Sequence, residues 1–340
     1  MKKKKILVTG GAGFIGLHTV VELNNAGYEP VIIDNFSNSE PKMIKRVEKI
    51  IQRHLRAYNE DCSNAKAVER IFKKEGRFHA IIHFAALKAV GESIEQPLRY
   101  YRNNIDSLIT LLELSHRYKT SHFVFSSSCT VYGQPDKIPV RETTPQRDAE
   151  CPYGDTKKIA ERILEAVVMS KALIKIVSLR YFNPIGAHPS SLIGELPLGV
   201  PKNLIPFVTQ TAAGIRKELI VHGNNYNTPD GTCIRDYIHV VDLARAHVKA
   251  LNYLEKTKAT CFYDVFNVGT GRGNSVLEVI RTFEKATGVK LNYRIGPRRP
   301  GDIVKVYANT DKSRKLLGWR HQYTLEDSLK HAWAWQKNIS

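Results

Sequence analysis

The feature that most restricts the fold of this chain is a glycine-rich turn close to its N-terminus. Gly10, Gly13 and Gly16 follow the apolar run Lys5–Thr9 and open the amphipathic segment Phe14–Ala26. This pattern predicts a strand, a tight turn and a helix whose first N–H groups favour a bound pyrophosphate. Glycines also occupy strand-to-helix turns for purely conformational reasons, so the turn needs support from its surroundings.

An acidic residue at the end of the next predicted strand supplies that support. Asp34 ends the apolar run Pro30–Asp34, 18 residues after Gly16. In dinucleotide-binding units, an acid at about this spacing accepts hydrogen bonds from the adenosine ribose. A carboxylate there repels a 2′-phosphate, so NAD is favoured over NADP. The alternative is a turn-forming aspartate, which does not account for its pairing with the glycines.

Short apolar runs and amphipathic segments alternate through the first half of the 340-residue chain. Strands are predicted at Lys5–Thr9, Pro30–Asp34, Ala80–Ala85, His122–Ser126 and Ala172–Arg180, and helices at Phe14–Ala26, Leu98–Tyr118 and from about Pro152. This alternation predicts an α/β fold with a Rossmann-type doubly wound parallel sheet that is covered on both faces. The length allows a smaller lobe beside that sheet.

The pattern changes from about Tyr181, where prolines punctuate an irregular stretch. Shorter elements follow, with helices expected near Val240–Glu255, Ser275–Thr287 and Leu325–Gln336. We predict an NAD-binding domain over residues 1–180. Residues 181–340 are expected to form mainly a C-terminal substrate-binding lobe, with some chain crossing back to the sheet.

The composition is globular and strongly basic. Lys and Arg number 51 against 33 Asp and Glu, which gives a net charge of +18. Such a charge fits nucleic acid, an anionic surface or a phosphorylated small substrate. The basic residues are spread along the chain without a nucleic-acid-binding motif, so we expect a solvated basic surface and no nucleic-acid partner.

The cysteines and the apolar runs indicate where the protein works. Five scattered cysteines without a CxxC pair favour a reducing compartment and predict no metal site. No apolar run is long enough to span a membrane. The basic start faintly imitates a secretion signal, but Gly10 and Gly11 interrupt the apolar run that follows it. We therefore predict a cytoplasmic protein that does not bind a membrane.

A second group of reactive residues lies further along the chain. Ser126, Ser127 and Ser128 end a predicted strand, and Tyr153 and Lys157 lie one turn apart on the following helix. An ammonium beside a phenol favours the phenolate, and an oxidised nicotinamide adds positive charge, so Tyr153 can act as a base. The Ser128 hydroxyl can hydrogen-bond the same substrate oxygen. A Tyr–Lys pair by itself is usually an exposed helix face, but the dinucleotide motif upstream favours the catalytic reading.

With these motifs the chain resembles the extended short-chain dehydrogenases/reductases, and among them the UDP-glucose (UDP-galactose) 4-epimerase family. The resemblance runs from about Lys5 to Gln336. It rests on GGAGFIG (10–16), HFAALKAVGES (83–93), SSSCTVYG (126–133), YGDTK (153–157), LRYFNPIGAHP (179–189), RDYIHV (235–240) and PRRPGD (297–302).

The resemblance implies NAD as the cofactor and suggests its contacts by position. Phe14 and Ile15 would donate backbone N–H groups to the pyrophosphate, and Lys157 would reach the nicotinamide ribose. The whole set implied to bind NAD is Gly10, Gly13, Phe14, Ile15, Gly16, Asp34, Asn35, Phe36, Ser37, Asn38, Ser39, Asp61, Cys62, Phe84, Ala85, Ala86, Leu87, Lys88, Asn103, Ser126, Tyr153, Lys157 and Phe182.

The resemblance also implies a UDP-sugar substrate and its binding residues. Arg235 and Arg299 suit a diphosphate because charge-assisted hydrogen bonds to phosphate are strong. The implied substrate set is Lys88, Ser128, Tyr153, Asn183, Asn203, Ile220, Val221, His222, Arg235, Arg299, Asp302 and Val306.

The implied reaction is the interconversion of UDP-galactose and UDP-glucose, an isomerisation in galactose metabolism. Tyr153, Lys157 and Ser128 would be the catalytic residues. Tyr153 would take the proton of the sugar 4-OH while a hydride leaves C4 for NAD. The 4-keto sugar would then turn over and receive the hydride on its opposite face. Homodimers are usual in this family, and we expect one here.

The chain departs from the family pattern at three positions. Cys129 follows the serines where a small residue is common, and we interpret it as a compact apolar substitute. His222 replaces an aromatic residue beside uracil. Val306 stands where some members carry a tyrosine, which either leaves room for an N-acetyl group on UDP-GlcNAc and UDP-GalNAc or is a local packing change.

Two other functions fit part of this sequence. Nucleotide-sugar 4,6-dehydratases and decarboxylases share the fold, but they need an acid/base carboxylate near Ser128, and Cys129 and Thr130 follow instead. An inactive NAD-binding protein whose basic surface engages nucleic acid is the other alternative. Intact Ser128, Tyr153 and Lys157 argue against it.

Overall fold

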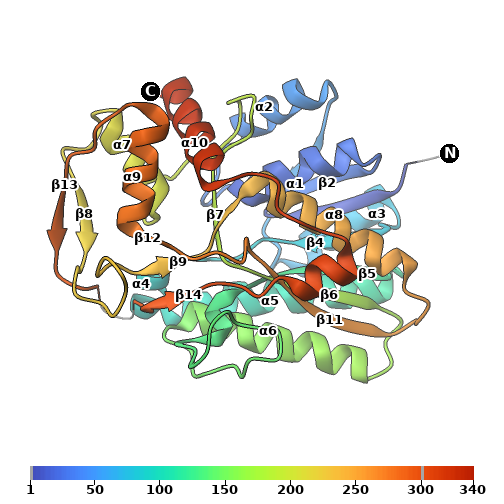
Figure 1. The fold of residues 1–340 in the computed structure, drawn as a ribbon. Coiled ribbons are helices and arrows are strands. Elements are labelled where there is room, and N and C mark those ends of the chain that lie inside the picture. Colours follow the sequence, from blue (N-terminus) through green and yellow to red (C-terminus); the bar gives the residue numbers. More distant parts are fainter. Residues whose placement is uncertain (1–2, 300–301) are drawn as a thin grey trace.

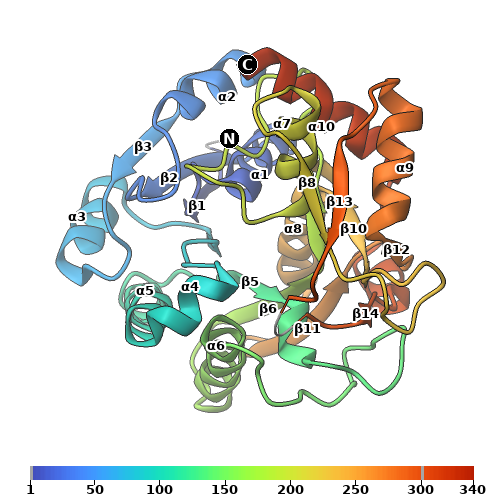
Figure 2. The ribbon, with the colours of Figure 1, turned by 90° about the vertical axis from the view of Figure 1, so that its left-hand side faces the viewer.

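The computed structural model describes residues 3–299 and 302–340. Its centre is a parallel sheet of seven strands in the order β11-β6-β5-β4-β1-β2-β3 (Figures 1 and 2). The strands are β1 (Lys5–Thr9), β2 (Glu29–Asp34), β3 (Arg56–Asn59), β4 (Ala80–His83), β5 (His122–Ser128), β6 (Lys175–Tyr181) and β11 (Phe262–Val268). The predicted Rossmann-type sheet is therefore confirmed.

Helices cover both faces of this sheet because strand residues alternate between two apolar clusters. Ile6 and Val8 belong to one cluster, whereas Leu7 between them belongs to the other. The first face carries α1 (Phe14–Asn25), α2 (Lys42–Ile51) and α8 (Val240–Lys256), and the second carries α3 (Ala65–Glu75), α5 (Pro97–Arg117) and α6 (Pro152–Met169). The strand order reverses between β1 and β4, which opens a crevice at the carboxyl ends of these strands.

A smaller lobe stands beside the carboxyl ends of the strands (Figure 2). Its short sheets pair β7 (Asn183–Ile185) with β10 (Tyr237–His239), β8 (Leu219–His222) with β13 (Tyr293–Gly296), and β9 (Ile234–Arg235) with β12 (Asn274–Ser275) and β14 (Lys305–Val306). Its helices are α7 (Leu204–Ala212), α9 (Val276–Thr287) and α10 (Leu325–Ile339). An apolar cluster that includes Val208, Phe283 and Leu329 packs these elements together.

Three short elements complete the description: α4 (Val90–Glu95), the 3-10 helix η1 (Cys129–Tyr132) and the π-helix η2 (Ser313–Leu317). The second half of the chain also returns to the main sheet, because β11 pairs with β6 and α8 packs against α1. Within the described residues, no helix has both the length and the apolar character that a membrane crossing requires.

The strand predictions were right in type but not always in extent. β4 ends at His83, two residues before the expected end, whereas β5 runs on to Ser128. Neither β3 nor β11 was predicted. β3 (Arg56–Asn59) is an edge strand with half-buried and exposed side chains, so it shows no apolar run. β11 is interrupted in sequence by Asp264 and Asn267, which find their polar partners only in the folded chain.

Candidate active site

A cavity of about 400 Å³ opens at the carboxyl ends of the central strands. Its wall includes the turn after β1, the loop from Asp34 to Ser39 after β2, the loop from Phe84 to Lys88 after β4, and Ser126 near the end of β5. This volume lies within the usual range for small-molecule and cofactor sites. The cavity also coincides with the reversal of strand order, where ligands bind in open α/β sheets.

The glycine turn is shaped by close approach of backbone segments. Gly10 has φ +65, and a Cβ added there would lie 2.7 Å from the backbone N of Ala85. A Cβ on Gly16 would overlap the carbonyl oxygen of Gly10 and would lie 2.8 Å from the Cα of Gly11. The turn therefore leaves backbone open to the cavity at the start of α1, as binding of a pyrophosphate requires.

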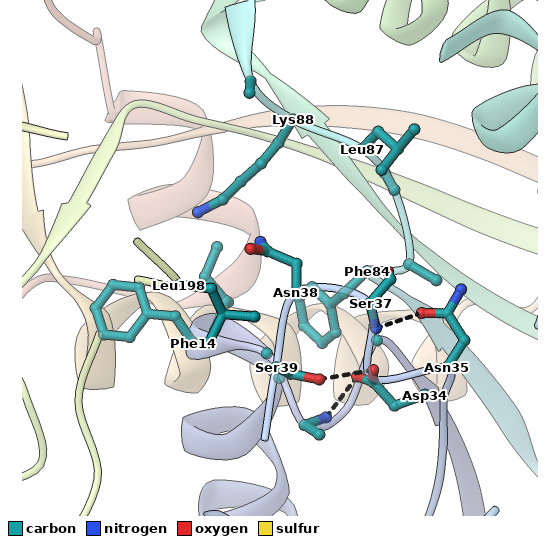
Figure 3. Close-up of a pocket in the computed structure, with 18 of the residues that line it drawn as sticks. Phe14, Asp34, Asn35, Ser37, Asn38, Ser39, Phe84, Leu87, Lys88 and Leu198 are labelled. Atoms are coloured by element: carbon teal, nitrogen blue, oxygen red, sulfur yellow. Dashed lines mark hydrogen bonds between the residues drawn. The ribbon is translucent and has the colours of Figure 1, made fainter. Parts of the chain in front are cut away.

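Asp34 ties the glycine turn to the loop that follows β2. One carboxylate oxygen accepts a hydrogen bond from the backbone N of Phe36 at 2.9 Å. The same oxygen accepts another from the Ser39 hydroxyl at 2.8 Å (Figure 3). The other accepts from the backbone N of Ala12 at 2.9 Å. Asp34 lines the cavity and is only 8% exposed. The carboxylate is thus held at the cavity wall in position to accept further hydrogen bonds from ribose hydroxyls.

A second acid lies beside Asp34 across the end of the sheet. Asp61 accepts hydrogen bonds from Asn35 at 2.9 Å and from the backbone N and the hydroxyl of Ser63 at 2.8 and 2.6 Å. Burial alone would raise the pKa of Asp61, but these hydrogen bonds lower it below its ordinary value. Asp61 therefore stays ionised and keeps the Asn35 loop in place.

The structure gathers nearly all residues predicted to bind NAD around this one cavity. Only Phe36 and Phe182 of that set are absent from its lining. Phe36 has φ 54 and packs against the core next to Asp34. Phe182 lies in a separate apolar cluster with Val306. The prediction of side-chain contact with NAD at these two positions has no support in the cavity geometry.

Tyr153 and Lys157 meet the cavity from the first turns of α6. Lys157 is 5% exposed, and its Nζ donates a hydrogen bond to the carbonyl oxygen of Ser126 at 2.7 Å. The same Nζ lies 5.9 Å from the centre of the Tyr153 ring and 4.9 Å from that of Phe125. The helix therefore sets the phenol and the ammonium side by side at the end of β5.

Without a bound cofactor, burial is the main cause of the pKa shifts of Lys157 and Tyr153. It lowers the pKa of Lys157 to about 7, and the Glu161 carboxylate opposes this shift. It raises the pKa of Tyr153 to about 12, and a hydrogen bond with Ser128 acts in the opposite direction. The chain alone thus favours a neutral phenol. The expected phenolate requires further positive charge in the cavity, which an oxidised nicotinamide carries.

Ser128 and Cys129 mark the passage from β5 into η1. The Ser128 Oγ accepts a hydrogen bond from the backbone N of Thr130 at 3.2 Å and lies close enough to Tyr153 to affect its pKa. Burial raises the pKa of the Cys129 thiol to about 12, which agrees with an inert, compact side chain at that position. Ser128 does not line the cavity itself.

Two arginines converge on one carboxylate in the smaller lobe. Arg299 donates a hydrogen bond to Asp302 at 3.3 Å, and Arg235 lies 3.8 Å from the same oxygen. Arg235 sits on β9, where it pairs in register with Val306 of β14. Its charge also lowers the pKa of Cys129, although burial outweighs it. Arg235 therefore lies near the end of β5 that carries Ser128.

The remaining residues predicted to bind substrate are divided between the cavity and the lobe. Lys88, Tyr153 and Asn203 line the cavity. Ser128, at the end of β5, lies outside its lining. So do the residues on β7, β8, β9, β14 and the neighbouring loops, which are Asn183, Ile220, Val221, His222, Arg235, Arg299, Asp302 and Val306. Among the described residues, no three His, Cys, Asp or Glu side chains are grouped as a metal site requires.

The cavity also has a wall of which the sequence analysis predicted only Asn203. Residues of the segment 194–203 line it, and among them Leu198 lines the cavity together with Phe14 (Figure 3). Two ion pairs join this segment to the loop after β4 and to α4. Glu195 lies 3.8 Å from Lys88, and Lys202 lies 3.6 Å from Glu92. Only its two glycines and two prolines distinguish it in the sequence, and these predict a loop rather than a binding wall.

Comparisons with known proteins agree on one family. Residues 7–332 match the family model described as GDP-mannose 4,6 dehydratase. A UDP-glucose 4-epimerase of Dictyostelium discoideum is 49% identical over 332 residues, which cover 98% of this chain and 95% of that protein. The crystal structure of UDP-glucose 4-epimerase from Bifidobacterium longum with NAD+ and UDP has a TM-score of 0.94 and 46% identity, with 98% of each chain covered.

One further solved structure bears on substrate range. The UDP-Glc/GlcNAc 4-epimerase of Campylobacter jejuni has a TM-score of 0.83 and 38% identity, covering 98% of this chain and 99% of that one.

Proposed function

The chain belongs to the UDP-glucose 4-epimerases of the NAD-dependent epimerase/dehydratase family, and we propose that it interconverts UDP-galactose and UDP-glucose with NAD as its cofactor. The observation that carries this proposal is the position of Tyr153 and Lys157 beside the end of β5, in the cavity that the glycine turn also lines. The protein is then an isomerase of galactose metabolism.

The cofactor site fits NAD in its chemistry. The glycine turn exposes backbone N–H groups at the start of α1. The Asp34 carboxylate can accept hydrogen bonds from ribose hydroxyls and would repel a 2′-phosphate. When bound, NAD would accept a hydride from sugar C4 and later return it. The buried wall around Tyr153 and Lys157 would exclude water from that exchange.

The chain's own side chains would handle the proton. Tyr153 would take it from the sugar 4-OH and give it back to the inverted alcohol. Lys157 would stabilise the phenolate, and the Ser128 hydroxyl would hydrogen-bond the same substrate oxygen. Because burial raises the pKa of Tyr153 to about 12, the base becomes active only with positive charge beside it.

The smaller lobe would hold the nucleotide. Arg235 and Arg299, already aligned by Asp302, are suited to the diphosphate, which would serve as the pivot for rotation of the 4-keto sugar. Residues 181–340 would thus form mainly the UDP-sugar lobe and residues 1–180 the NAD-binding domain. The returning elements α8 and β11 are the exceptions to this division.

The matching family model raises 4,6-dehydration as the competing activity. That reaction needs a carboxylic acid or carboxylate near Ser128 to eliminate water across C5 and C6. The next positions are Cys129 and Thr130. The carboxylate of the buried Asp236 is not available as an acid or base, because it already accepts hydrogen bonds from the backbone N of Thr270, Gly271 and Ala308. Epimerisation alone is therefore the better fit.

The direct test is an assay of the purified protein with UDP-galactose. The expected result is formation of UDP-glucose to an equilibrium mixture, with NAD co-purifying or stimulating the reaction. A 4-keto-6-deoxy product would instead establish the dehydratase. Binding of NAD with no conversion of UDP-galactose would contradict the proposed function.

We also propose that N-acetylated UDP-sugars are accepted. Val306 is 2% exposed and packs in an apolar cluster with Phe182 and Tyr132, next to Cys129. A valine fills less of this wall than an aromatic residue would, which leaves room toward the sugar. The C. jejuni enzyme similar to this chain is described as acting on both sugar types.

The Val306→Tyr variant tests this substrate range. We expect turnover of UDP-GalNAc to fall at least about tenfold relative to UDP-galactose, because one bulky side chain in a pocket changes discrimination by roughly 1–3 kcal/mol. The measurement is the ratio of kcat/KM for the two substrates, with Val306→Ile as the matched control. An unchanged ratio in the tyrosine variant would show that Val306 is only a packing difference.

A homodimer through α5 and α6 is the third proposal. These helices pack together, with Tyr101 hydrogen-bonded to Asp155 at 2.7 Å. α5 leaves Leu98 81% exposed and Ile109 40% exposed on its outer side. A second copy could cover this apolar row with its own helix pair, as closed two-fold dimers do.

Leu98→Glu is expected to convert the dimer to a monomer, because it places a charge at the apolar interface. Light scattering after gel filtration measures the mass directly. Ile215→Glu is the control, since Ile215 is also exposed but lies in the smaller lobe. A dimer that survives Leu98→Glu, or a wild-type monomer, would refute this interface.

A cytoplasmic location is proposed on the cysteines. All five are free in the structure, and Cys62, Cys151 and Cys233 are buried. Free buried thiols are typical of proteins in reducing compartments. Fractionation of the source cells with an antibody to the protein tests this location.

A further inference from the structure

A buried ion pair lies directly behind the catalytic residues and has no role in the mechanism given above. Arg180 on β6 and Glu161 on α6 are each 4% exposed. The guanidinium donates to both carboxylate oxygens, from Nε at 2.9 Å and from Nη2 at 2.6 Å. Burying two charges is costly unless the geometry is excellent, and this bidentate pair meets that condition.

The pair is embedded in a network that leaves few of its polar atoms free. Glu161 also accepts hydrogen bonds from the Ser127 hydroxyl at 2.5 Å and from the Gln146 amide at 2.9 Å. Arg180 donates to the Tyr132 hydroxyl at 3.0 Å, which in turn donates to Asn267 on β11 at 2.6 Å. The network therefore joins α6 to β5, β6, β11 and the segment that follows η1.

Two consecutive turns of α6 form hydrogen bonds with two consecutive residues of β5. Lys157 donates to the Ser126 carbonyl at 2.7 Å, and Glu161, one turn later, accepts from Ser127. Because neighbouring strand residues point to opposite faces, fixing Ser127 also fixes the direction of Ser126 and Ser128. These two contacts fix how α6 lies against the end of β5, where the reactive side chains are found.

Glu161 also acts on the charge of Lys157. Burial lowers the pKa of Lys157, and the Glu161 carboxylate is the group that raises it. Tyr153 on α6 lies beside Lys157, and His83 on β4 senses its charge. Tyr181 on β6 interacts with Ser126 and Tyr153, and Asp155 lies in the first turn of α6. His83 is neutral, because burial and the charge of Lys157 lower its pKa to about 3. Asp155 is engaged by Tyr101.

We propose that Glu161 is a positioning residue of the active site, which keeps Lys157 in its charged form and orients the end of β5, while Arg180 holds Glu161 in place. This inference deepens the proposed function and rests on the roles given there to Tyr153 and Lys157. The reaction gains from it because only charged Lys157 stabilises the phenolate of Tyr153.

The test separates charge from shape at position 161. Glu161→Asp keeps the charge, whereas the double variant Glu161→Gln/Arg180→Met removes both charges and leaves no buried ion unpaired. Lys157 is titrated in the NAD-loaded protein by NMR with lysine labelled at Cε, and its signal is assigned with Lys157→Met. We expect the Lys157 midpoint to fall by about one pH unit in the double variant and to stay near the wild-type value in Glu161→Asp.

A second readout follows the reaction itself. The alkaline limb of kcat for UDP-galactose should move to lower pH in the double variant and not in Glu161→Asp, because activity is lost when Lys157 loses its proton. Lower activity with an unchanged Lys157 midpoint in the double variant would overturn the inference. The Glu161–Arg180 pair would then only stabilise the fold. If the wild-type protein does not turn over UDP-galactose but the Lys157 midpoint still falls in the double variant, the proposed function is refuted, whereas the effect of Glu161 on Lys157 stands.

Discussion

Replacing Tyr153 with Phe should lower kcat for UDP-galactose by roughly 10²–10⁴-fold, the usual contribution of a general base. The substitution removes the one hydroxyl that can exchange a proton with the sugar 4-OH. It leaves the ring packed beside Lys157 and the end of β5. Binding of NAD should therefore be nearly unchanged. Turnover is measured by a coupled assay, and bound NAD by its release from the denatured protein.

Tyr118→Phe is the matched control for this experiment. Tyr118 follows α5, and its hydroxyl contacts Glu69 at 3.1 Å, away from the cavity. That variant should retain wild-type turnover. Near-normal activity in Tyr153→Phe would mean that another group carries the proton and would remove Tyr153 from the mechanism.

Replacing Gly16 with Ala should weaken NAD binding by roughly 10–100-fold and lower the melting temperature. The new Cβ would overlap backbone atoms of Gly10 and Gly11, which cannot move as a flexible side chain could. Overpacking of this kind costs roughly 1–3 kcal/mol, and each 1.4 kcal/mol is a factor of ten in affinity. Isothermal titration with NAD measures the binding, and thermal unfolding without NAD measures the stability.

Gly91→Ala provides the comparison at a glycine without neighbours. A Cβ at Gly91 in α4 would meet no atom within 4 Å outside its chain neighbours and its own helix backbone. Alanine favours a helix more than glycine does, so this variant should bind NAD normally and be as stable as wild type or slightly more stable. If Gly16→Ala behaved like Gly91→Ala, the close approach of the turn would not be needed for cofactor binding.

The cofactor half of the site was largely predictable because its signals are local. Gly10, Gly13 and Gly16 follow a strand directly, and Asp34 ends the next strand. The rules of parallel sheets then bring both to the same edge. The substrate lobe was predictable only through resemblance, since Arg235 and Arg299 are distant in sequence and meet at Asp302 through β9 and the loop before β14.

Polar residues at distant positions were the least predictable part of the fold. Arg180 reads in the sequence as a strand residue and Glu161 as one of several helix charges. β3 and β11 were missed for a related reason: their polar residues break the apolar pattern by which strands are recognised. Asn267 of β11 is fully buried, yet it is hydrogen-bonded to Tyr132 and to the Val140 carbonyl.

The sequence by itself determined five of the seven strands of the parallel sheet, the glycine turn, the identity of the cofactor and the Tyr–Lys pair. These features depend on periodicity and on spacings within one βαβ unit or one helix, which are local properties of the chain. The tertiary structure alone decided the ionisation of Tyr153 and Lys157, the ion pair behind them and the wall at 194–203. Protonation depends on burial and on charges from other elements, and buried polar partners are chosen by packing rather than by sequence distance.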